Sequence, residues 1–209
     1  MPRTFIRLIA FLALCAASAL AQAQSWPAKP IHFVVPFGPG STDILARMLA
    51  PKVSAALGQP IVVENRPGAT GNVGSLQVAK SPADGYTMLF GAAAAQAVNP
   101  SLFSNIGYDP LKDLAPVILV ASIPNVVIVN PKLPIKSIAD LIAAAKARPN
   151  ALNYSSNGSG SSQHMAAALF ESSTGVKMVH VPYKGSSEGI VAVVRGAVSV
   201  MFANLPPAL

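Results

Sequence analysis

Residues Ile31 to Leu49 read IHFVVPFGPGSTDILARML, and this stretch carries the strongest local fold signal in the chain. A short apolar run comes first, as in a buried strand, and Pro36 ends it because proline has no N–H for a strand ladder. A tight glycine loop follows, and Ser41, Thr42 or Asp43 is expected to cap the helix after it. This order of strand, loop and helix start aims free backbone N–H groups at one point, which favours an anion.

A second stretch of the same type lies in the other half of the chain. Residues 155–164 read SSNGSGSSQH, after a short strand expected at Leu152–Tyr154 and before a helix expected from about Ser162 to Ser173. We call residues 155–164 the serine loop. Each loop alone is compatible with a plain turn between a strand and a helix. Two such loops, one in each half, predict a ligand held between two lobes.

The first 23 residues have the pattern of a secretory signal peptide. Arg3 and Arg7 precede a mostly apolar, alanine-rich stretch that is too short for a spanning helix, and Ala21-Gln22-Ala23 fits a cleavage site. The mature chain is therefore expected to start near Gln24 and to be soluble in the periplasm. Lipid attachment at Cys15 is disfavoured, because a small residue would be expected directly before it.

Composition narrows the function classes further. The only cysteine lies in the leader, so the mature chain has no disulfide or cysteine-metal site. Removing the two leader arginines lowers the formal charge from +7 to +5, and the remaining basic residues are scattered, which argues against nucleic acid as a partner. The 3 histidines have no close acidic partners in sequence, so no metal and no cofactor is expected.

Strands and helices alternate along the chain, which predicts parallel-rich sheets flanked by helices. Pro124 separates two extended runs that resemble a crossing between lobes. The further strands are expected at Ile61–Glu64, Tyr86–Phe90, Val117–Ala121, Asn125–Val129, Met178–Val181 and Val198–Phe202. The further helices are expected at Thr42–Leu57, Val73–Lys80, Ile138–Ala147 (capped by Ser137) and Glu188–Val194.

Several segments match one protein family as an ordered set. They are Pro36-Phe37-x-Pro39-Gly40 with Asp43-x-x-Ala46-Arg47, Glu64-Asn65-Arg66-Pro67-Gly68-Ala69-x-Gly71-Asn72-x-Gly74, Ala83-Asp84-Gly85-Tyr86-Thr87, Gly158-x-Gly160-Ser161-Ser162-x-His164 and His180-Val181-Pro182-Tyr183-Lys184-Gly185. Over nearly all of the mature chain, the sequence resembles the Bug family of periplasmic solute receptors, which serve tripartite tricarboxylate transporters.

The resemblance implies an α/β, two-lobed periplasmic-binding-protein (type II) fold that binds a small carboxylate in the cleft. Family ligands include di- and tricarboxylates, acidic amino acids and aromatic acids. The resemblance also implies a monomer that delivers its ligand to the membrane subunits of a transporter. The loop at Phe37–Asp43 corresponds to a family loop that contacts the ligand partly through water, and Gly158–His164 corresponds to one that grips a carboxylate at a helix start.

Two features depart from the family pattern. The Pro36–Asp43 loop is one residue shorter than usual, and the family continues for roughly another hundred residues. We therefore expect a first lobe in residues 24–121, a second lobe in residues 122–209, and an incomplete first lobe with an unpaired sheet edge. A non-functional remnant of a longer receptor is the alternative interpretation.

The candidate ligand-binding residues come from both loops, from Asn72 at a further helix start, and from the turn at Tyr183 and Lys184, which either lines the cleft or is a solvated turn. His164 is either a ligand contact or a structural histidine bonded to its own loop. Asp43 is expected to bond the backbone, orienting the first loop or capping the helix, rather than to touch an anion. The full set is Phe37, Gly38, Gly40, Ser41, Asp43, Asn72, Ser159, Gly160, Ser161, Ser162, His164, Tyr183 and Lys184.

An enzyme is the rival class, and two versions of it are disfavoured. Gly38-x-Gly40 followed by Glu64 imitates a dinucleotide-binding start, but Asp43 stands where the third glycine belongs and would face pyrophosphate. A serine hydrolase would need a nucleophile elbow, and in the serine loop Ser161 and Ser162 lie too close to His164 to form a nucleophile–base pair readily.

Overall fold

The structure is a computed structural model that describes residues 26–208, and β1 (Ile31–Val35) forms the centre of its first sheet. That sheet is parallel, with the order β2-β1-β3, where β2 is Ile61–Asn65 and β3 is Thr87–Leu89. Four of the five residues of β1 are buried. A strand covered on both faces needs such a continuous apolar run, so the sequence places β1 at the centre.

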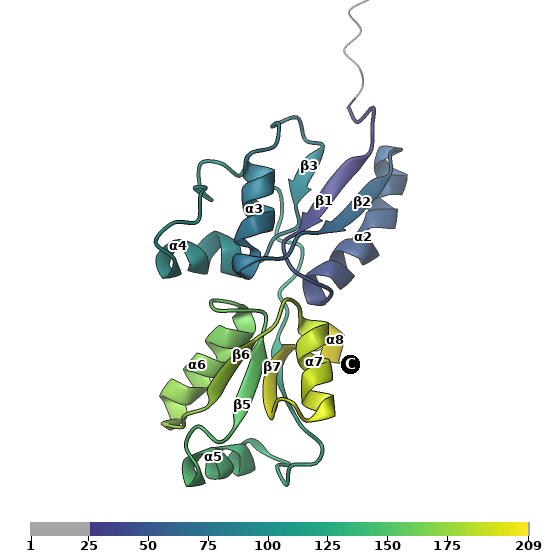
Figure 1. Cartoon of the computed structure of the whole chain (residues 1–209). Coiled ribbons are helices and arrows are strands. Elements are labelled where there is room, and N and C mark those ends of the chain that lie inside the picture. Colours follow the sequence, from purple (N-terminus) through teal and green to yellow (C-terminus); the bar gives the residue numbers. More distant parts are fainter. Residues whose placement is uncertain (1–25, 209) are drawn as a thin grey trace, which may run out of the picture.

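Two helices cover opposite faces of this first sheet, as Figure 1 shows. They are α2 (Ser41–Leu57), which ends at Gly58 in the left-handed region with φ of 69°, and α3 (Asn72–Ala79). The rest of the lobe consists of η1 (Ala69–Gly71), the π-helical turn η2 (Ala94–Val98) and α4 (Asn99–Leu102). We call these elements, with β1 to β3, the first lobe.

The second sheet has the order β4-β7-β5-β6 and belongs to the second lobe. Its strands are β4 (Asn125–Val129), β5 (Asn153–Ser156), β6 (Val179–Pro182) and β7 (Val200–Asn204). Three strands are parallel, whereas β4 pairs with β7 in the antiparallel sense. Periodicity alone did not indicate this exception, because β4 enters the lobe directly from the crossing rather than after a helix of that lobe.

Four helices complete the second lobe, and they divide its core in two. They are α5 (Ile138–Ala147), α6 (Ser162–Thr174), α7 (Ser186–Arg195) and the short α8 (Leu205–Ala208). One apolar cluster joins α5 and α6 to Val200 and Phe202, and the other joins α7 to Met201 and Ala203. Because side chains alternate along β7, the strand supplies both clusters and is buried throughout.

The sequence located most elements to within two residues, with two local corrections. The first helix begins after Gly40, which makes no side-chain cap, so the expected caps Ser41, Thr42 and Asp43 all lie inside the helix. Residues 117–121 are extended but form no strand, and Val117 to Leu119 are between 76% and 82% exposed. The expected signal peptide lies outside the described residues. Among the described residues, no helix is both long and apolar enough to cross a bilayer.

A core substitution should show how strongly the second lobe depends on its α5 face. Leu141 is 0% exposed in the α5–α6 cluster, so Leu141→Ala is expected to lower the free energy of unfolding by about 2–5 kcal/mol. Leu169 on α6 is 69% exposed and provides the matched control. Chemical denaturation of both variants would measure the difference, and equal losses would contradict the assigned core.

Candidate ligand-binding site

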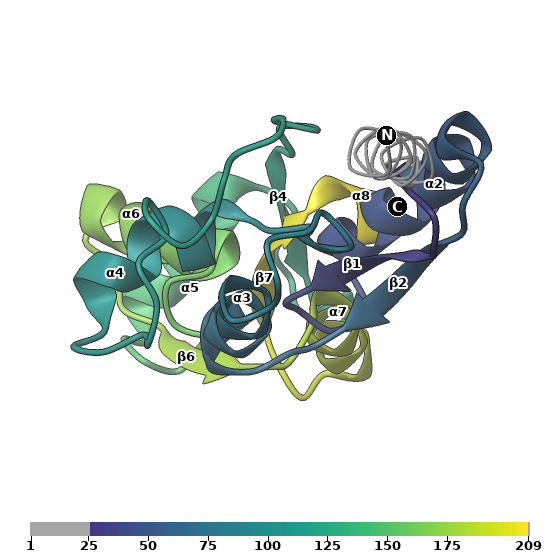
Figure 2. The ribbon, with the colours of Figure 1, turned by 90° about the horizontal axis from the view of Figure 1, so that it is seen from above.

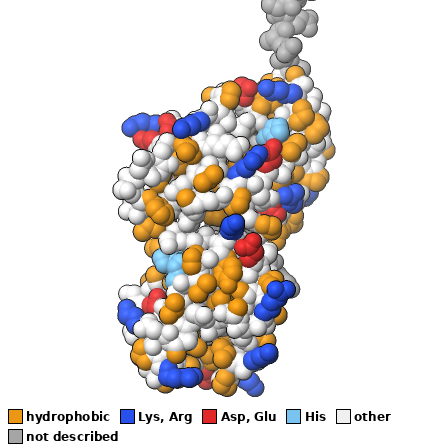
Figure 3. Space-filling model, viewed as in Figure 1, with side chains coloured by type: hydrophobic (Ala, Val, Ile, Leu, Met, Phe, Trp, Pro, Cys, Tyr) orange, Lys and Arg blue, Asp and Glu red, His pale blue; other side chains and the backbone are white. Residues whose placement is uncertain are grey.

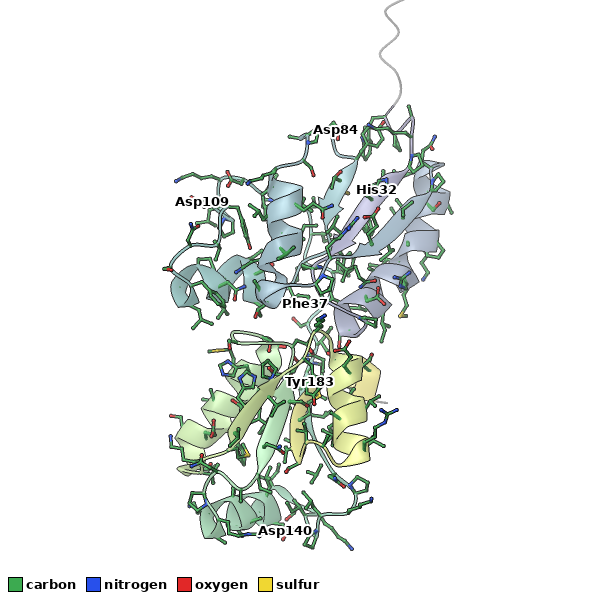
Figure 4. The ribbon with its side chains drawn as sticks, viewed as in Figure 1. His32, Phe37, Asp84, Asp109, Asp140 and Tyr183 are labelled. Carbon is green, nitrogen blue, oxygen red and sulfur yellow. The ribbon has the colours of Figure 1, made fainter. Side chains whose placement is uncertain are left out.

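The two lobes touch where the first loop meets the segment before α7. The Gly38 N–H donates to the Lys184 carbonyl oxygen at 3.0 Å, and the Ser187 N–H donates to the Pro39 carbonyl oxygen at 3.3 Å. In Figure 4, Phe37 and Tyr183 lie on the facing ends of the two lobes. We call the region where the first loop, η1 and α4 of the first lobe meet the serine loop and the α7 start of the second lobe the junction.

The serine loop forms the second contact of the junction. A methyl group on Gly158 would lie 2.7 Å from Thr70 Oγ1, and one on Gly160 would lie 2.9 Å from Asn99 Oδ1. Both glycines have positive φ angles, 104° and 90°, so the backbone angle and the available space each exclude a side chain there. The loops predicted to face each other therefore do meet across the lobes.

Four helices start at the junction, and this sets its electrostatics. In Figure 1 the carboxyl ends of the parallel strands in both sheets point toward the middle of the molecule, and α2, α3, α6 and α7 begin there. The first N–H groups of each helix have no partner within the helix, so each start carries partial positive charge. The starts of α2 and α7 lie close together across the lobes, because a methyl group on Gly40 before α2 would lie only 3.1 Å from Ser186 Oγ on α7.

Ser41 is the clearest unpartnered polar group at this place. It is the first residue of α2 and only 5% exposed, and its hydroxyl oxygen has no hydrogen-bond partner in the described part of the chain. A buried hydroxyl without a partner costs free energy. A ligand that supplied a partner would remove that cost.

Asp43 holds the first loop through side chains, and the expected bond to the backbone is wrong. Its Oδ1 accepts from Arg47 Nε at 2.9 Å, Arg47 donates onward to Asn65 Oδ1, and Asn65 Nδ2 donates to the Phe37 carbonyl oxygen at 3.0 Å. An arginine four residues further along the same helix lies on the same face, and it competes successfully for the carboxylate. The chain of contacts thus runs from α2 through β2 to the loop.

Asn72 at the start of α3 is tied to a residue that the sequence did not single out. Asn99 is 0% exposed, and its Nδ2 donates to Asn72 Oδ1 at 2.8 Å and to the Thr70 carbonyl oxygen at 2.9 Å. Because a carbonyl oxygen can only accept, the amide nitrogen must face Thr70, and Asn99 Oδ1 points toward Gly160. Asn99 therefore orders the wall of the first lobe against which the serine loop packs.

In the serine loop, the individual residues have different surroundings. Ser161 is buried and caps α6, since its hydroxyl accepts from the His164 N–H at 3.3 Å, whereas Ser159 is exposed. Ser162 Oγ accepts from Asn204 Nδ2 at 3.2 Å. His164 Nδ1 accepts from the Gly160 N–H at 3.1 Å, which is the contact expected of the structural alternative for this histidine.

A stack of rings supports the serine loop from one side. The centroids of His164 and His180 are 4.4 Å apart, and those of His180 and Tyr154 are 5.0 Å apart. His180 Nε2 lies 2.6 Å from Ser156 Oγ, and that hydroxyl accepts from the Gly158 N–H at 3.0 Å. Burial, followed by the charge of His164, lowers the pKa of His180 to about 4, and burial also lowers the pKa of His164. Both imidazoles are neutral near pH 7.

Tyr183 and Lys184 lie at the edge of the junction. The Tyr183 ring packs against the α7 cluster, and Lys184 is exposed while its carbonyl joins the lobes. On the face that Figure 3 shows, basic and acidic side chains are dispersed over both lobes rather than gathered in one patch. Lys184 thus contributes to the junction through its backbone, and in the described part of the chain its ammonium group makes no hydrogen bond or ion pair.

Buried amides and hydroxyls of the second lobe escaped sequence reasoning. Gln163 and Ser186 are 0% and 1% exposed, and both are bonded to the Asn157 side of the serine loop. The only signal in the sequence was their place at the start of a helix, which is shared by many residues with no special role. The hydrogen bond between Gln163 and Ser186 joins residues 23 positions apart, and no local sequence pattern predicts it.

One nucleophile-elbow pattern lies outside the serine loop, and the structure does not support it as a catalytic site. Residues 185–189 read GSSEG, which matches Gly-x-Ser-x-Gly between β6 and α7. The serine of a nucleophile elbow lies on a sharp, strained turn of the backbone. Ser187 has no such strain, because its φ angle is not positive. All 3 histidines of the chain bond elsewhere, to Glu64, Gly160 and Ser156. Glu64 would bind the ribose in the dinucleotide-binding alternative, but its carboxylate is already hydrogen-bonded to His32 and Arg66.

Two α/β lobes that meet through the carboxyl ends of their strands define a two-lobed periplasmic-binding-protein fold. The family described as "Tripartite tricarboxylate transporter family receptor" matches residues 45–209, and the chain belongs to this family. Protein BugT of Bordetella pertussis is 43% identical over 201 residues, which are 95% of this chain and 62% of BugT. The chain thus spans less than two thirds of this relative.

Solved structures support the same fold. An R. palustris protein with adipate superposes with a TM-score of 0.86 at 42% identity, covering 88% of this chain and 62% of the other. MatC from Rhodopseudomonas palustris with bound malate gives a TM-score of 0.82 at 29% identity, covering 88% of this chain and 63% of the other. The expected fold class and the expected family are both confirmed.

The neutral histidine stack generates a pH prediction. Because the folded pKa of His180 is about 4, below the ordinary value of 6.5, the unfolded chain binds a proton that the folded chain excludes between these values. Stability should therefore fall as the pH drops through that window. We expect a loss of about 1–2 kcal/mol, reduced from the full value because the rings are only half-buried.

Urea denaturation at several pH values would measure this loss. In His180→Gln, the part of the loss in stability that this ring causes at low pH should disappear, although the variant starts from a lower stability. A wild-type stability that stays flat across the window would show that the stack does not exclude protons.

Proposed function

We propose that the protein is an extracytoplasmic solute receptor that binds a small carboxylate at the junction, for uptake by a tripartite tricarboxylate transporter. The observation that carries the proposal is the convergence of helix starts from both lobes around buried neutral donors, with Gly40 of one lobe directly against Ser186 of the other. Helix starts and hydroxyls can hold a carboxylate without a cation.

The candidate residues then take distinct roles. Gly40 and Ser41 bind through the α2 start, and Ser161 and Ser162 bind through the α6 start. Gly38 and Gly160 shape the two loops, because their N–H groups donate to the Lys184 carbonyl oxygen and to His164 Nδ1. Phe37 supplies a buried apolar wall, since its ring lies against Gly71 and Ala95. Asp43 and Asn72 position the loops, His164 steadies the serine loop, and Ser159, Tyr183 and Lys184 form the rim.

The comparisons support a carboxylate as the ligand class. Two of the similar proteins were solved with dicarboxylates, adipate in one and malate in the other. Each charge-assisted hydrogen bond contributes about 1.5–3 kcal/mol, and a site built from such bonds binds tightly enough to capture a solute without an ion pair. We further propose a periplasmic location, a monomer, and the membrane subunits of a transporter as partners.

The direct test is a thermal melt of the protein with a panel of mono-, di- and tricarboxylates that includes adipate and malate. A ligand at 100 times its dissociation constant should stabilise the protein by about 2.7 kcal/mol, which raises the melting temperature by about 5–11 °C. Uncharged diols of the same length serve as controls. If the protein unfolds cooperatively and no acid raises its melting temperature, this result would argue against a receptor and favour the remnant interpretation.

Ser41 provides the sharpest single-residue test of the site. Ser41→Ala removes a hydroxyl that has no partner in the described chain, so the free protein should keep its stability or gain slightly. Carboxylate binding should weaken about tenfold, because a bond to a charged group is lost. Isothermal titration with the best acid of the panel would measure the change.

The control for this test is Ser155→Ala. Ser155 is 0% exposed, and its hydroxyl donates to the Gly189 carbonyl oxygen at 3.3 Å. This variant should lose stability while keeping its affinity. The opposite pattern, with Ser41→Ala destabilised and binding unchanged, would remove Ser41 from the site.

A further inference from the structure

Gln163 lies at the centre of a buried network behind the serine loop. It is 0% exposed, and its side chain makes three hydrogen bonds. Oε1 accepts from the Asn157 N–H at 3.0 Å, and Nε2 donates to Ser186 Oγ at 2.9 Å and to Asn204 Oδ1 at 2.6 Å. One side chain thus joins the loop, the start of α7 and the end of β7 to the helix α6 that carries it.

The network continues to the place where the chain crosses between the lobes. Asn204 Nδ2 donates to Asn125 Oδ1 at 2.8 Å and to Ser162 Oγ at 3.2 Å, and Asn125 Nδ2 donates to the Ser162 carbonyl oxygen at 3.2 Å. Asn125 is the first residue of β4, directly after the crossing. Beside it, the Leu205 N–H donates to the Pro124 carbonyl oxygen at 3.1 Å.

This network, which we call the amide relay, consists of Asn125, Asn157, Gln163, Ser186 and Asn204. Burying amides costs free energy that packed apolar groups would not cost, unless every polar atom finds a partner. Apolar clusters lie on both sides of the same sheet, so the lobe does not need the relay for its core. The relay members are also all uncharged, in a place where a carboxylate side chain would repel an anion.

We infer that Gln163 is a positioning residue: it fixes the serine loop and the start of α7 relative to each other and to the crossing, so that their donors meet one carboxylate. The inference rests on the proposed function and deepens it. Gln163 does not touch the ligand. It acts through Asn157, whose N–H it holds, and through Ser186, whose hydroxyl it orients.

The decisive variant is Gln163→Glu, which keeps the shape of the side chain and the oxygen that accepts from the Asn157 N–H but replaces the Nε2 donor with an acceptor. Ionised, the new carboxylate lies behind an anion site and removes the donor to Asn204. Burial and a nearby ligand anion raise the pKa of such a group. We therefore expect the variant to bind adipate or malate about tenfold more weakly than wild type at about pH 8. The difference in affinity should narrow toward about pH 6, as the new glutamate becomes neutral.

The matched control is Gln77→Glu, which makes the same change on the exposed face of α3. It should bind as wild type does at both pH values. Isothermal titration of the three proteins with both acids would supply the affinities. A Gln163→Glu variant that binds like wild type throughout, while wild type binds an acid, overturns the inference, as does a loss of affinity that does not depend on pH.

A second measurement tests the relay without any ligand. Gln163→Met has a similar volume but cannot accept from Asn157, so amide hydrogen exchange of residues 157–160 should speed up by about tenfold while α5 stays protected. Unchanged exchange in the loop would also overturn the inference. Wild type that binds neither acid would count against the proposed function, and the exchange result would still decide whether Gln163 holds the loop.

Discussion

The direction of the parallel strands is the constraint on which the rest of this structure depends. A strand followed by a helix and a parallel strand returns the chain in one sense, so each helix that follows a parallel strand begins at the carboxyl edge of its sheet, whereas α5, which follows the antiparallel β4, begins at the opposite edge. In both lobes this edge faces the other lobe (Figure 1), and in the view from above in Figure 2 the two lobes overlap. The site is therefore a consequence of connectivity before any particular side chain is considered.

Neutral donors follow from that geometry. When several helix starts converge, they already supply positive potential, and a buried lysine or arginine would add a cation that must be paired in the empty site. Asp43, an acid beside the first loop, is paired with Arg47 rather than left to face the ligand. The same logic explains why the histidines behind the serine loop remain neutral and serve as acceptors and stacking partners.

Sequence reasoning recovered what is encoded locally. The cap Ser137 and the facing glycine loops are both signalled by residues next to the feature itself. The antiparallel partner of β4 and the bonds of Gln163 could not be predicted in this way, because their partners lie far away along the chain. The wrong cap on α2 has the same origin, since the sequence does not show that Gly40 lies against another lobe.

Glycine at the junction has a physical role that extends to ligand selection. Gly185 has an ordinary extended backbone with φ of −158°, yet a methyl group there would lie 2.8 Å from the Pro39 carbonyl oxygen. Space, not backbone angle, therefore requires glycine at this position. Bare backbone on both sides lets the two lobes approach until the N–H of Gly38 reaches a carbonyl of the other lobe.

Under the proposed function, this close approach would set how the protein discriminates among acids. Donors fixed to two backbones select a ligand by the spacing of its oxygen atoms, because neither set of N–H groups can move toward a ligand that is too short. Long, flexible lysine or arginine side chains would adapt to many acids. A site built from backbone donors changes its selectivity only when the distance between the lobes changes. In the proposed receptor, Gly38 and Gly185, which fix this distance, would therefore influence ligand choice alongside the residues that touch the ligand.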